Sequence, residues 1–532
     1  SPAEDKPVAE QCGSINYMEG HDSYMKYVIG VDIGTSGTKT VLFTLDGGVV
    51  ASSVREYPLY QPQNGYAEQE PADWWNATVA TIAEVLAKSG TGGGEIAGIG
   101  LSGQMHGLVM LGKDGEVLRR SIIWCDQRTA AECEEITRKV GARRLVEITA
   151  NPALTGFTAS KILWVRNNEP GVYEQCRKIL LPKDYIRYML TGEFATEVSD
   201  ASGMQLLDVP KRDWSAEVLE KLEIDRELLG KVYESPEITG RVSEKAARLT
   251  GLKAGTPIVG GAGDNAAAAV GTGVVEDGKA FTTIGTSGVV FAHTSRISID
   301  LPGRVHTFCC AVPGAWHVMG VTQAAGLSLK WFRDNLCSAE VEAAKGMDID
   351  SYVLLDKQAA QVPIGANRLL YLPYLMGERT PHLDASARGV FFGLSAIHTR
   401  RDMLRAVMEG VSYSLKDCLS VLEEMGVAVG NMAACGGGGS SALWRQMLAD
   451  LYDCPVKTIA SKEGPALGVA LLAAVGAGEY ASVAEACSAV IQYGPACEPV
   501  AENTAAYLKY YTLYKELYPN LKDSFQRLAV TG

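Results

Sequence analysis

The pentapeptide Ile-Gly-Thr-Ser-Gly occurs twice in this chain of 532 residues, at Ile33–Gly37 and at Ile284–Gly288, about half the chain length apart. Each copy follows an apolar, β-branched run and is followed by residues such as Val41 or Phe291. Strand-forming residues on both sides of a short Gly/Ser/Thr turn predict a β-hairpin. Two hairpins of the same sequence, one in each half, predict a duplicated fold.

These turns also predict a binding property. A turn of this composition directs several backbone N–H groups and hydroxyls into one concavity, which suits a phosphate group. A single copy would be an ordinary hairpin turn, because Gly, Thr and Ser are common turn residues. Two copies with matching flanks favour two lobes that hold a polyphosphate between them.

The charge and hydropathy of the chain exclude several classes of protein. The formal net charge at pH 7 is −13 and no run of Lys and Arg is present, which argues against a nucleic-acid partner. The longest apolar stretch, Pro465–Gly478, is too short and too rich in glycine to cross a membrane, and it predicts a core helix. An acidic protein that binds phosphate must use backbone amides, local dipoles and a metal ion.

The cysteines and histidines show no metal-site spacing. The 12 cysteines form no C-x-x-C pair and the 7 histidines no H-E-x-x-H motif, so neither a zinc site nor a disulfide framework is predicted. Most of the cysteines are expected to be small core residues in a reducing compartment, which favours a cytoplasmic location.

The organisation of the chain is that of an α/β protein with two domains. Residues 1–24 lack periodicity and are expected to be a disordered leader or appended segment outside the fold. Strand and helix patterns then alternate, and the stretch Gly271–Gly278 predicts the boundary between the two domains. Helices are expected at Asp73–Ser89, with Asp73 as the N-cap, and at Asp402–Met425.

Asp32 stands at the end of the first predicted strand, directly before the first turn. A carboxylate beside a phosphate site is repulsive unless a cation lies between them, so a Mg²⁺ ion is the natural partner. The alternative is that Asp32 only stabilises the turn. Lys39, on the returning strand, faces either the phosphates or solvent.

Asp264 lies in Gly260–Ala269, between a buried strand and an alanine-rich helix. It stands in an N-cap region, and capping is the simpler explanation. However, the glycines before it and the alanines after it leave space for a substrate hydroxyl. A carboxylate that accepts the hydroxyl proton during phosphoryl transfer is the general base of a kinase.

The segment Ser102–Gly107 contains a Met-His pair between glycines. If His106 is buried it needs hydrogen-bond partners, so it is either a structural histidine or a donor to a polyol hydroxyl. Met105 would then pack on the carbon skeleton of that polyol. Gly98–Gly103 and Gly261–Ala266 imitate a dinucleotide fingerprint, but neither has the required context, and no P-loop motif is present.

Four glycines and two serines, Gly436–Ser441, directly precede a predicted helix. Glycine allows a ligand to approach the backbone, and a helix N-terminus favours a phosphate or an adenine edge. A flexible linker is the alternative, but a linker is not expected between a strand and a core helix.

Together these residues resemble the FGGY carbohydrate kinases over about residues 26–525. Lys161–Asn168 is similar to the first signature of this family, and Gly389–Leu394 followed by Asp402–Glu409 is similar to the second. The resemblance implies an α/β fold of two ribonuclease-H-like, actin-like ATPase domains with an interdomain cleft. Residues 25–272 would form the N-terminal, sugar-binding domain and residues 273–529 the C-terminal, nucleotide-binding domain.

The resemblance also implies an activity. Ser102–Gly107, Trp124–Arg128 and Gly263–Asn265 are similar to the family members that act on D-xylulose. ATP and Mg²⁺ are then expected to phosphorylate D-xylulose at its 5-hydroxyl, and a homodimer is the expected assembly. Sedoheptulose, D-ribulose and gluconate remain alternative substrates. An actin-like ATPase without sugar transfer is a less favoured alternative, and a dehydrogenase comes third.

Individual roles follow from the same resemblance. Asp264 corresponds to the catalytic base, and Asp32 to the carboxylate that binds magnesium directly or through a water. The sugar would contact Met105, His106, Asp264 and Asn265. The nucleotide would contact residues of both turns, of the glycine loop and of one helix: Thr35, Ser36, Thr286, Ser287, Trp331, Gly437, Gly438 and Ser441.

Overall fold

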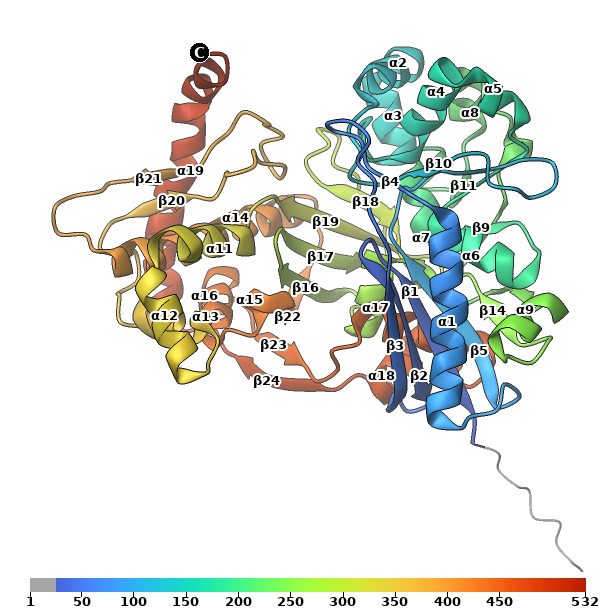
Figure 1. The fold of residues 1–532 in the computed structure, drawn as a ribbon. Helices are drawn as coiled ribbons and strands as arrows, with labels where there is room; N and C mark the ends of the chain where they lie inside the picture. The colour runs from blue at the N-terminus through green and yellow to red at the C-terminus, as the bar shows by residue number, and fades with distance from the viewer. Residues whose placement is uncertain (1–24) are drawn as a thin grey trace, which may run out of the picture.

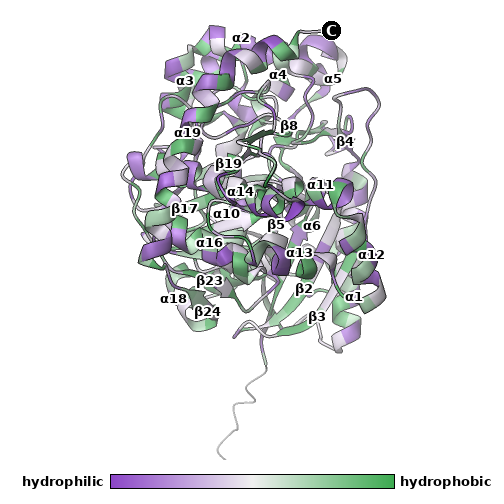
Figure 2. Ribbon diagram, turned by 90° about the vertical axis from the view of Figure 1, so that its left-hand side faces the viewer, coloured by the Kyte–Doolittle hydropathy of each residue, from purple (hydrophilic) through white to green (hydrophobic). Residues whose placement is uncertain are grey.

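The computed structural model describes residues 25–532, and the expected leader, residues 1–24, lies outside the described residues. Two sheets of seven strands each form the centres of two halves, with helices around them (Figure 1). Apolar residues concentrate in the central strands, while the outer helices carry both hydrophilic and hydrophobic residues, as half-buried helices do (Figure 2).

The first sheet is built around a hairpin and one parallel neighbour. Its main path is β13-β14-β5-β1-β2-β3. β1 pairs antiparallel with β2, β2 antiparallel with β3, and β1 parallel with β5. The strands are β1 (Tyr27–Ile33), β2 (Gly37–Thr44), β3 (Val49–Glu56), β5 (Ile96–Gly103), β13 (Ile238–Arg241) and β14 (Pro257–Val259). The seventh strand, β15 (Ala262–Gly263), pairs parallel with β5 outside this path.

The second sheet repeats this arrangement, which confirms the duplicated fold. Its order is β18-β19-β17-β16-β22-β23-β24. β16 pairs antiparallel with β17 and parallel with β22, as β1 does with β2 and β5. The strands are β16 (Gly278–Ile284), β17 (Gly288–Thr294), β18 (His306–Cys309), β19 (Trp316–Thr322), β22 (Val429–Cys435), β23 (Val456–Ile459) and β24 (Tyr493–Cys497).

Two helices pack against each other between the sheets, α10 (Asp264–Gly271) and α17 (Gly464–Gly476). A Cβ on Gly468 would lie 1.9 Å from the carbonyl oxygen of Ala267, so the two backbones almost touch. α17 also lies directly on the first sheet, because a Cβ on Gly100 would lie 2.0 Å from the carbonyl oxygen of Val469. A helix from the end of the chain therefore covers the sheet formed by its beginning.

The outer helices largely follow the sequence pattern. α1 (Pro71–Ser89) packs on β2 and β3, and α14 (Arg400–Glu424) packs on the second sheet. The prediction of Asp73 as N-cap is wrong. The helix begins two residues earlier, with Glu70 as N-cap, because Pro71 has the φ angle that a first helical turn requires. Asp73 lies in that first turn.

The two halves meet a second time, far along the chain from α10 and α17. The helices α2 (Ala130–Val140), α3 (Ala142–Thr149) and α4 (Thr158–Asn168) belong to a helical layer of the first half that packs beside β18 (Figure 1). The backbone N–H of Cys309 donates to Oγ of Ser202 at 3.0 Å. Of the described helices, none is both long and apolar enough to cross a membrane.

Candidate active site

The first Gly-Thr-Ser-Gly turn joins β1 to β2 and is held by side chains of the first half. The N–H of Gly34 closes the turn on the carbonyl of Gly37 at 3.0 Å. Nε2 of Gln69 donates to the carbonyl of Thr35 at 2.6 Å, and Nε1 of Trp124 donates to its hydroxyl at 2.8 Å. Ser36 is exposed at the tip. The turn is therefore fixed before any ligand arrives.

The second turn joins β16 to β17 and is held by a helix instead. The N–H of Gly326 donates to the carbonyl of Gly285 at 2.7 Å, and the N–H of Ala325 donates to that of Thr286 at 3.0 Å. Gly326 begins α11 (Gly326–Leu336), and a Cβ there would lie 2.4 Å from the carbonyl oxygen of Gly285. Glycine at this position lets the first turn of α11 rest on the hairpin.

Asp32 lies in β1, one residue before its end, and is half-buried. Oγ of Ser102 donates to its Oδ1 at 3.0 Å, and burial raises the pKa of Asp32 although Ser102 and Lys39 act against it. Nζ of Lys39 lies 2.6 Å from Oε2 of Glu463, and 38% of the lysine side chain is exposed to solvent.

The donor set around Asp32 fits a hydrated magnesium ion rather than a complete protein cage. Among the described residues no group of three His, Cys, Asp or Glu side chains could hold a metal ion. Mg²⁺ usually keeps several waters and binds one or two carboxylates together with substrate phosphates. A single carboxylate beside a phosphate turn meets that requirement.

Asp264 is the first residue of α10, after Gly263 as N-cap, so it does not cap the helix itself. Its Oδ1 accepts only a local hydrogen bond, from the N–H of Asn265 at 2.8 Å. Burial, and after it the charge of Asp32, raises the pKa of Asp264 to about 7. A carboxylate with a pKa near neutrality is suited to accept a proton at physiological pH.

A buried ionic network supports the loop before Asp264, and sequence reasoning missed it. Nη2 of Arg187 donates to the carbonyl of Gly260 at 2.8 Å, and Oγ of Ser199 accepts from the N–H of Gly263 at 3.1 Å. Nζ of Lys183 lies within 3.1 Å of three carboxylates, those of Asp184, Glu197 and Asp200. Burial and the neighbouring carboxylates raise the pKa of Asp200, while Lys183 acts against them.

His106 has a strained backbone, with φ at +73°. Its carbonyl accepts from Oγ1 of Thr158 at 3.0 Å and from Nζ of Lys161 at 3.1 Å, and its Nδ1 lies 2.9 Å from the carbonyl of Gly203. Burial lowers the pKa of His106 to about 3, so the ring is neutral and donates from Nδ1. Nδ1 thus has the structural partner predicted for a buried histidine. Nε2 carries no proton, so toward a polyol hydroxyl it is an acceptor rather than the predicted donor.

Met105 lies against the loop that precedes Asp264. It packs with Phe157 and Phe308, and a Cβ on Gly263 would lie 2.9 Å from its Cγ. The glycine before Asp264 thus lets the methionine approach this loop. Phe157 and Phe308, which carry no sequence motif, complete an apolar wall on this side of the site.

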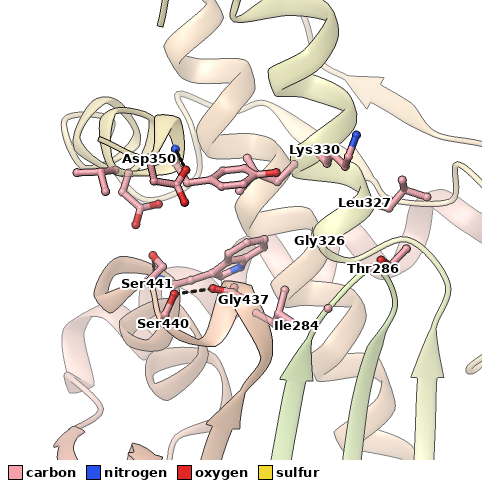
Figure 3. A pocket seen from close by; sticks show the side chains of 16 residues that line it. Ile284, Thr286, Gly326, Leu327, Lys330, Asp350, Gly437, Ser440 and Ser441 are labelled. Atoms are coloured by element: carbon pink, nitrogen blue, oxygen red, sulfur yellow. Dashed lines mark hydrogen bonds between the residues drawn. The ribbon is translucent and has the colours of Figure 1, made fainter. Parts of the chain in front are cut away.

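A cavity of about 480 Å³ in the second half extends from the second turn to the glycine loop (Figure 3). Thr286, Gly437, Gly438 and Ser441, four of the residues predicted to contact the nucleotide, line this one cavity. Ser441 also caps α16 (Ala442–Tyr452), since its Oγ accepts from the N–H of Trp444 at 3.1 Å.

Other residues of this cavity were not predicted. Lys330 of α11 lines it, as do Asp350 at the N-terminus of α13 (Ser351–Ala360) and Tyr352 within that helix. Trp331, which the resemblance placed near the nucleotide, is not among the lining residues; it lies on α11 with 37% of its surface exposed. Lys330 and Trp331 are consecutive on α11, and consecutive side chains on a helix point in different directions. This explains why Lys330 lines the cavity and Trp331 does not.

Two matching sheets with a hairpin turn from each define a two-domain α/β fold of the actin-like ATPase type. The chain belongs to the FGGY family of carbohydrate kinases. The N-terminal domain of the family matches residues 27–271 of this chain, and the C-terminal domain of the family matches residues 280–477. As in other carbohydrate kinases, ATP is the expected phosphoryl donor.

Individual proteins support this assignment over nearly the whole chain. The xylulose kinase of Bacillus subtilis is 40% identical over 94% of this chain and 98% of its own length. The crystal structure of xylulose kinase from Rhodospirillum rubrum has a TM-score of 0.88 at 30% identity, over 94% of this chain and all of that one. Gluconate kinase from Lactobacillus acidophilus matches with a TM-score of 0.88 at 29% identity, over 95% of this chain and all of that one.

Proposed function

We propose that the protein transfers the γ-phosphoryl group of MgATP to the 5-hydroxyl of D-xylulose. The observation that carries the proposal is Asp264, whose pKa near 7 and position beside Met105 suit a general base for a polyol hydroxyl. The names of the similar xylulose kinases support the choice of sugar. In this proposal residues 25–272 bind the sugar and residues 273–529 bind the nucleotide.

The chemistry is a direct transfer. The 5-hydroxyl oxygen attacks the γ-phosphorus, its proton passes to Asp264, the bond to the bridging oxygen breaks, and ADP leaves. The backbone N–H groups and hydroxyls of Thr35, Ser36, Thr286 and Ser287 hold the phosphates from both sides. Asp32 would bind the magnesium ion, directly or through a water. When bound, magnesium supplies positive charge that neutralises the phosphate oxygens.

A coupled assay of ADP release tests the proposal. ADP formation from MgATP should rise strongly with D-xylulose and much less with sedoheptulose, D-ribulose, xylitol or gluconate. The product should carry phosphate on C5, visible by phosphorus–carbon coupling in NMR. ADP release that no sugar stimulates would contradict kinase activity and favour an ATPase without sugar transfer.

Gluconate is the second candidate substrate, because a gluconate kinase is as similar in structure as the xylulose kinase cited above. The same panel separates the two. Preference for gluconate would keep the proposed mechanism and change the acceptor.

A further inference from the structure

Arg379 is a cation of the second half that reaches the sugar side of the site. It lies in the segment between β20 (Leu370–Leu372) and β21 (Val390–Phe392), and its Nη1 is 2.9 Å from Nε2 of His306. Burial is the largest cause of the lowered pKa values of His306 and His106, and the positive charge of Arg379 adds to both. The ring of His306 lies 5.6 Å from that of Phe308, which packs with Met105 and lies 6.4 Å from the ring of His106. Arg379 is therefore close to the Met105–His106 pair of the first half.

The position of this guanidinium is fixed by residues of both halves. Nδ1 of His306 lies 2.6 Å from Oδ1 of Asn151, an acceptor, so Nδ1 carries the proton and Nε2 accepts from Arg379. Nδ2 of Asn151 donates to the carbonyl of Thr307 at 3.3 Å, which ties the first half to β18. The hydrogen bonds between Asn151 and His306 and between His306 and Arg379 thus hold one N–H group of the guanidinium on the histidine. The other N–H groups of the guanidinium are not bound by His306.

Arg379 differs from the other buried arginines of the chain in its charge environment. Arg128 pairs with Asp126, Arg212 with Glu234, and Arg405 with Glu409. Within residues 25–532, Arg379 has no carboxylate partner, and burial alone lowers its pKa. The residue is half-buried, and its one side-chain hydrogen bond is the contact of Nη1 with His306. Polar groups of a ligand can therefore replace the water around the other guanidinium N–H groups.

The packing around Met105 and His106 shows which end of a sugar Arg379 can reach. Met105 lies against Gly263, the residue before Asp264. The ring of Phe157 lies 4.8 Å from that of His106 and 5.8 Å from that of His306, which Arg379 contacts. Arg379 therefore lies at the His106 end of the site, and Asp264 lies at the Met105 end.

Building on the proposed function, we propose that Arg379 donates a hydrogen bond to the 1-hydroxyl of the sugar whose 5-hydroxyl faces Asp264. Arg379 is then a specificity-determining residue that the second half adds to a sugar site otherwise built by the first. One bound sugar contacts both halves, so sugar binding favours their approach.

The test compares kcat/KM for D-xylulose and 1-deoxy-D-xylulose, which lacks only the hydroxyl in question. Wild type should prefer D-xylulose by roughly 10- to 150-fold, the range for a hydrogen bond to a charged group. In Arg379→Met this preference should fall close to one, through loss of activity on D-xylulose, while KM for ATP stays unchanged. Arg388→Met, an exposed arginine of the same segment, should keep the wild-type preference.

The alternatives give different results. An equal loss on both sugars, with the preference retained, would mean that Arg379 only maintains the structure, and would overturn the inference. Arg379→Lys serves if the methionine variant does not fold: a single ammonium cannot reproduce the fork of a guanidinium, so the preference should be reduced. Failure of wild type to phosphorylate D-xylulose would overturn the proposed function itself.

Discussion

The two halves share a hairpin sequence and a sheet order but differ in where they place acidic groups. In the first half, Asp32 precedes the turn and Asp264 begins the crossing helix α10. In the second half, Thr283 precedes the turn, and Glu463, the N-cap of α17, is neutralised by Lys39 at 2.6 Å. The comparison teaches that duplication supplied two matching hairpins, while the two carboxylates of the proposed mechanism belong to one half.

The acids at the starts of α10 and α17 give the sharpest test of this difference. Asp264→Asn should lower kcat by about 10²- to 10⁴-fold, the usual contribution of a general base. Glu463→Gln should have a much smaller effect, because a partly exposed ion pair contributes only about 0–1 kcal/mol. Steady-state kinetics with D-xylulose measure both. Comparable losses would show that the asymmetry between the halves is not catalytic.

The positions before the two turns give the next test. Asp32→Ala should raise the magnesium concentration needed for half-maximal activity by roughly 10- to 100-fold, the range for residues that support a metal site. Thr283→Ala should leave the magnesium requirement unchanged. Titration of activity with Mg²⁺ at saturating ATP measures this. An unchanged requirement in Asp32→Ala would refute the metal role.

The contact between the two crossing helices can be broken at one glycine. Gly468→Ala should lower the free energy of unfolding by about 1–3 kcal/mol, because its Cβ would lie 1.9 Å from a backbone oxygen of α10. Gly464→Ala is the matched control on α17, since a Cβ there meets nothing within 4 Å. Thermal or urea unfolding compares them. Equal free energies of unfolding for the two variants would show that the close contact between α10 and α17 does not stabilise the protein.

The smallest expected effect is a dependence of stability on pH. The folded-state pKa of Asp264 is raised to about 7, so the ionised carboxylate destabilises the native state. This penalty grows as pH rises from about 4 to about 7 and is constant above. Asp264→Asn should therefore melt a few degrees above wild type near pH 8, with a smaller difference near pH 5. A difference independent of pH would contradict the raised pKa.

The hairpins, the duplication and the position of Asp264 could be predicted because each depends on local sequence. A Gly/Ser/Thr turn between β-branched runs specifies a hairpin wherever it occurs. Glycines before an acidic residue and alanines after it indicate that other groups can approach its carboxylate closely. Pro71 sets the start of α1, which is an equally local signal. The prediction missed this signal because it took the acidic Asp73 as the N-cap.

Other features could not be predicted, because they depend on contacts between distant segments. α17 is apolar on every side, so its sequence does not tell which sheet it covers. Lys183 and Arg187 resemble surface residues of a helix in sequence, but both are buried. Glu197 and Asp200, from later in the chain, pair with Lys183. Arg187 donates to the carbonyls of Ala195 and Gly260. Arg379 and His306 carry no motif, and only the fold brings them beside His106.

The placement of α17 also bears on how the protein forms during synthesis. Domains generally fold as units, the N-terminal one first, as the chain is made. Here Ala466, Leu467 and Val469 complete an apolar cluster with Val28, Val41 and Phe43 of the first two strands. The N-terminal domain thus exposes an uncovered apolar face until most of the chain has left the ribosome, and the two domains must finish folding together.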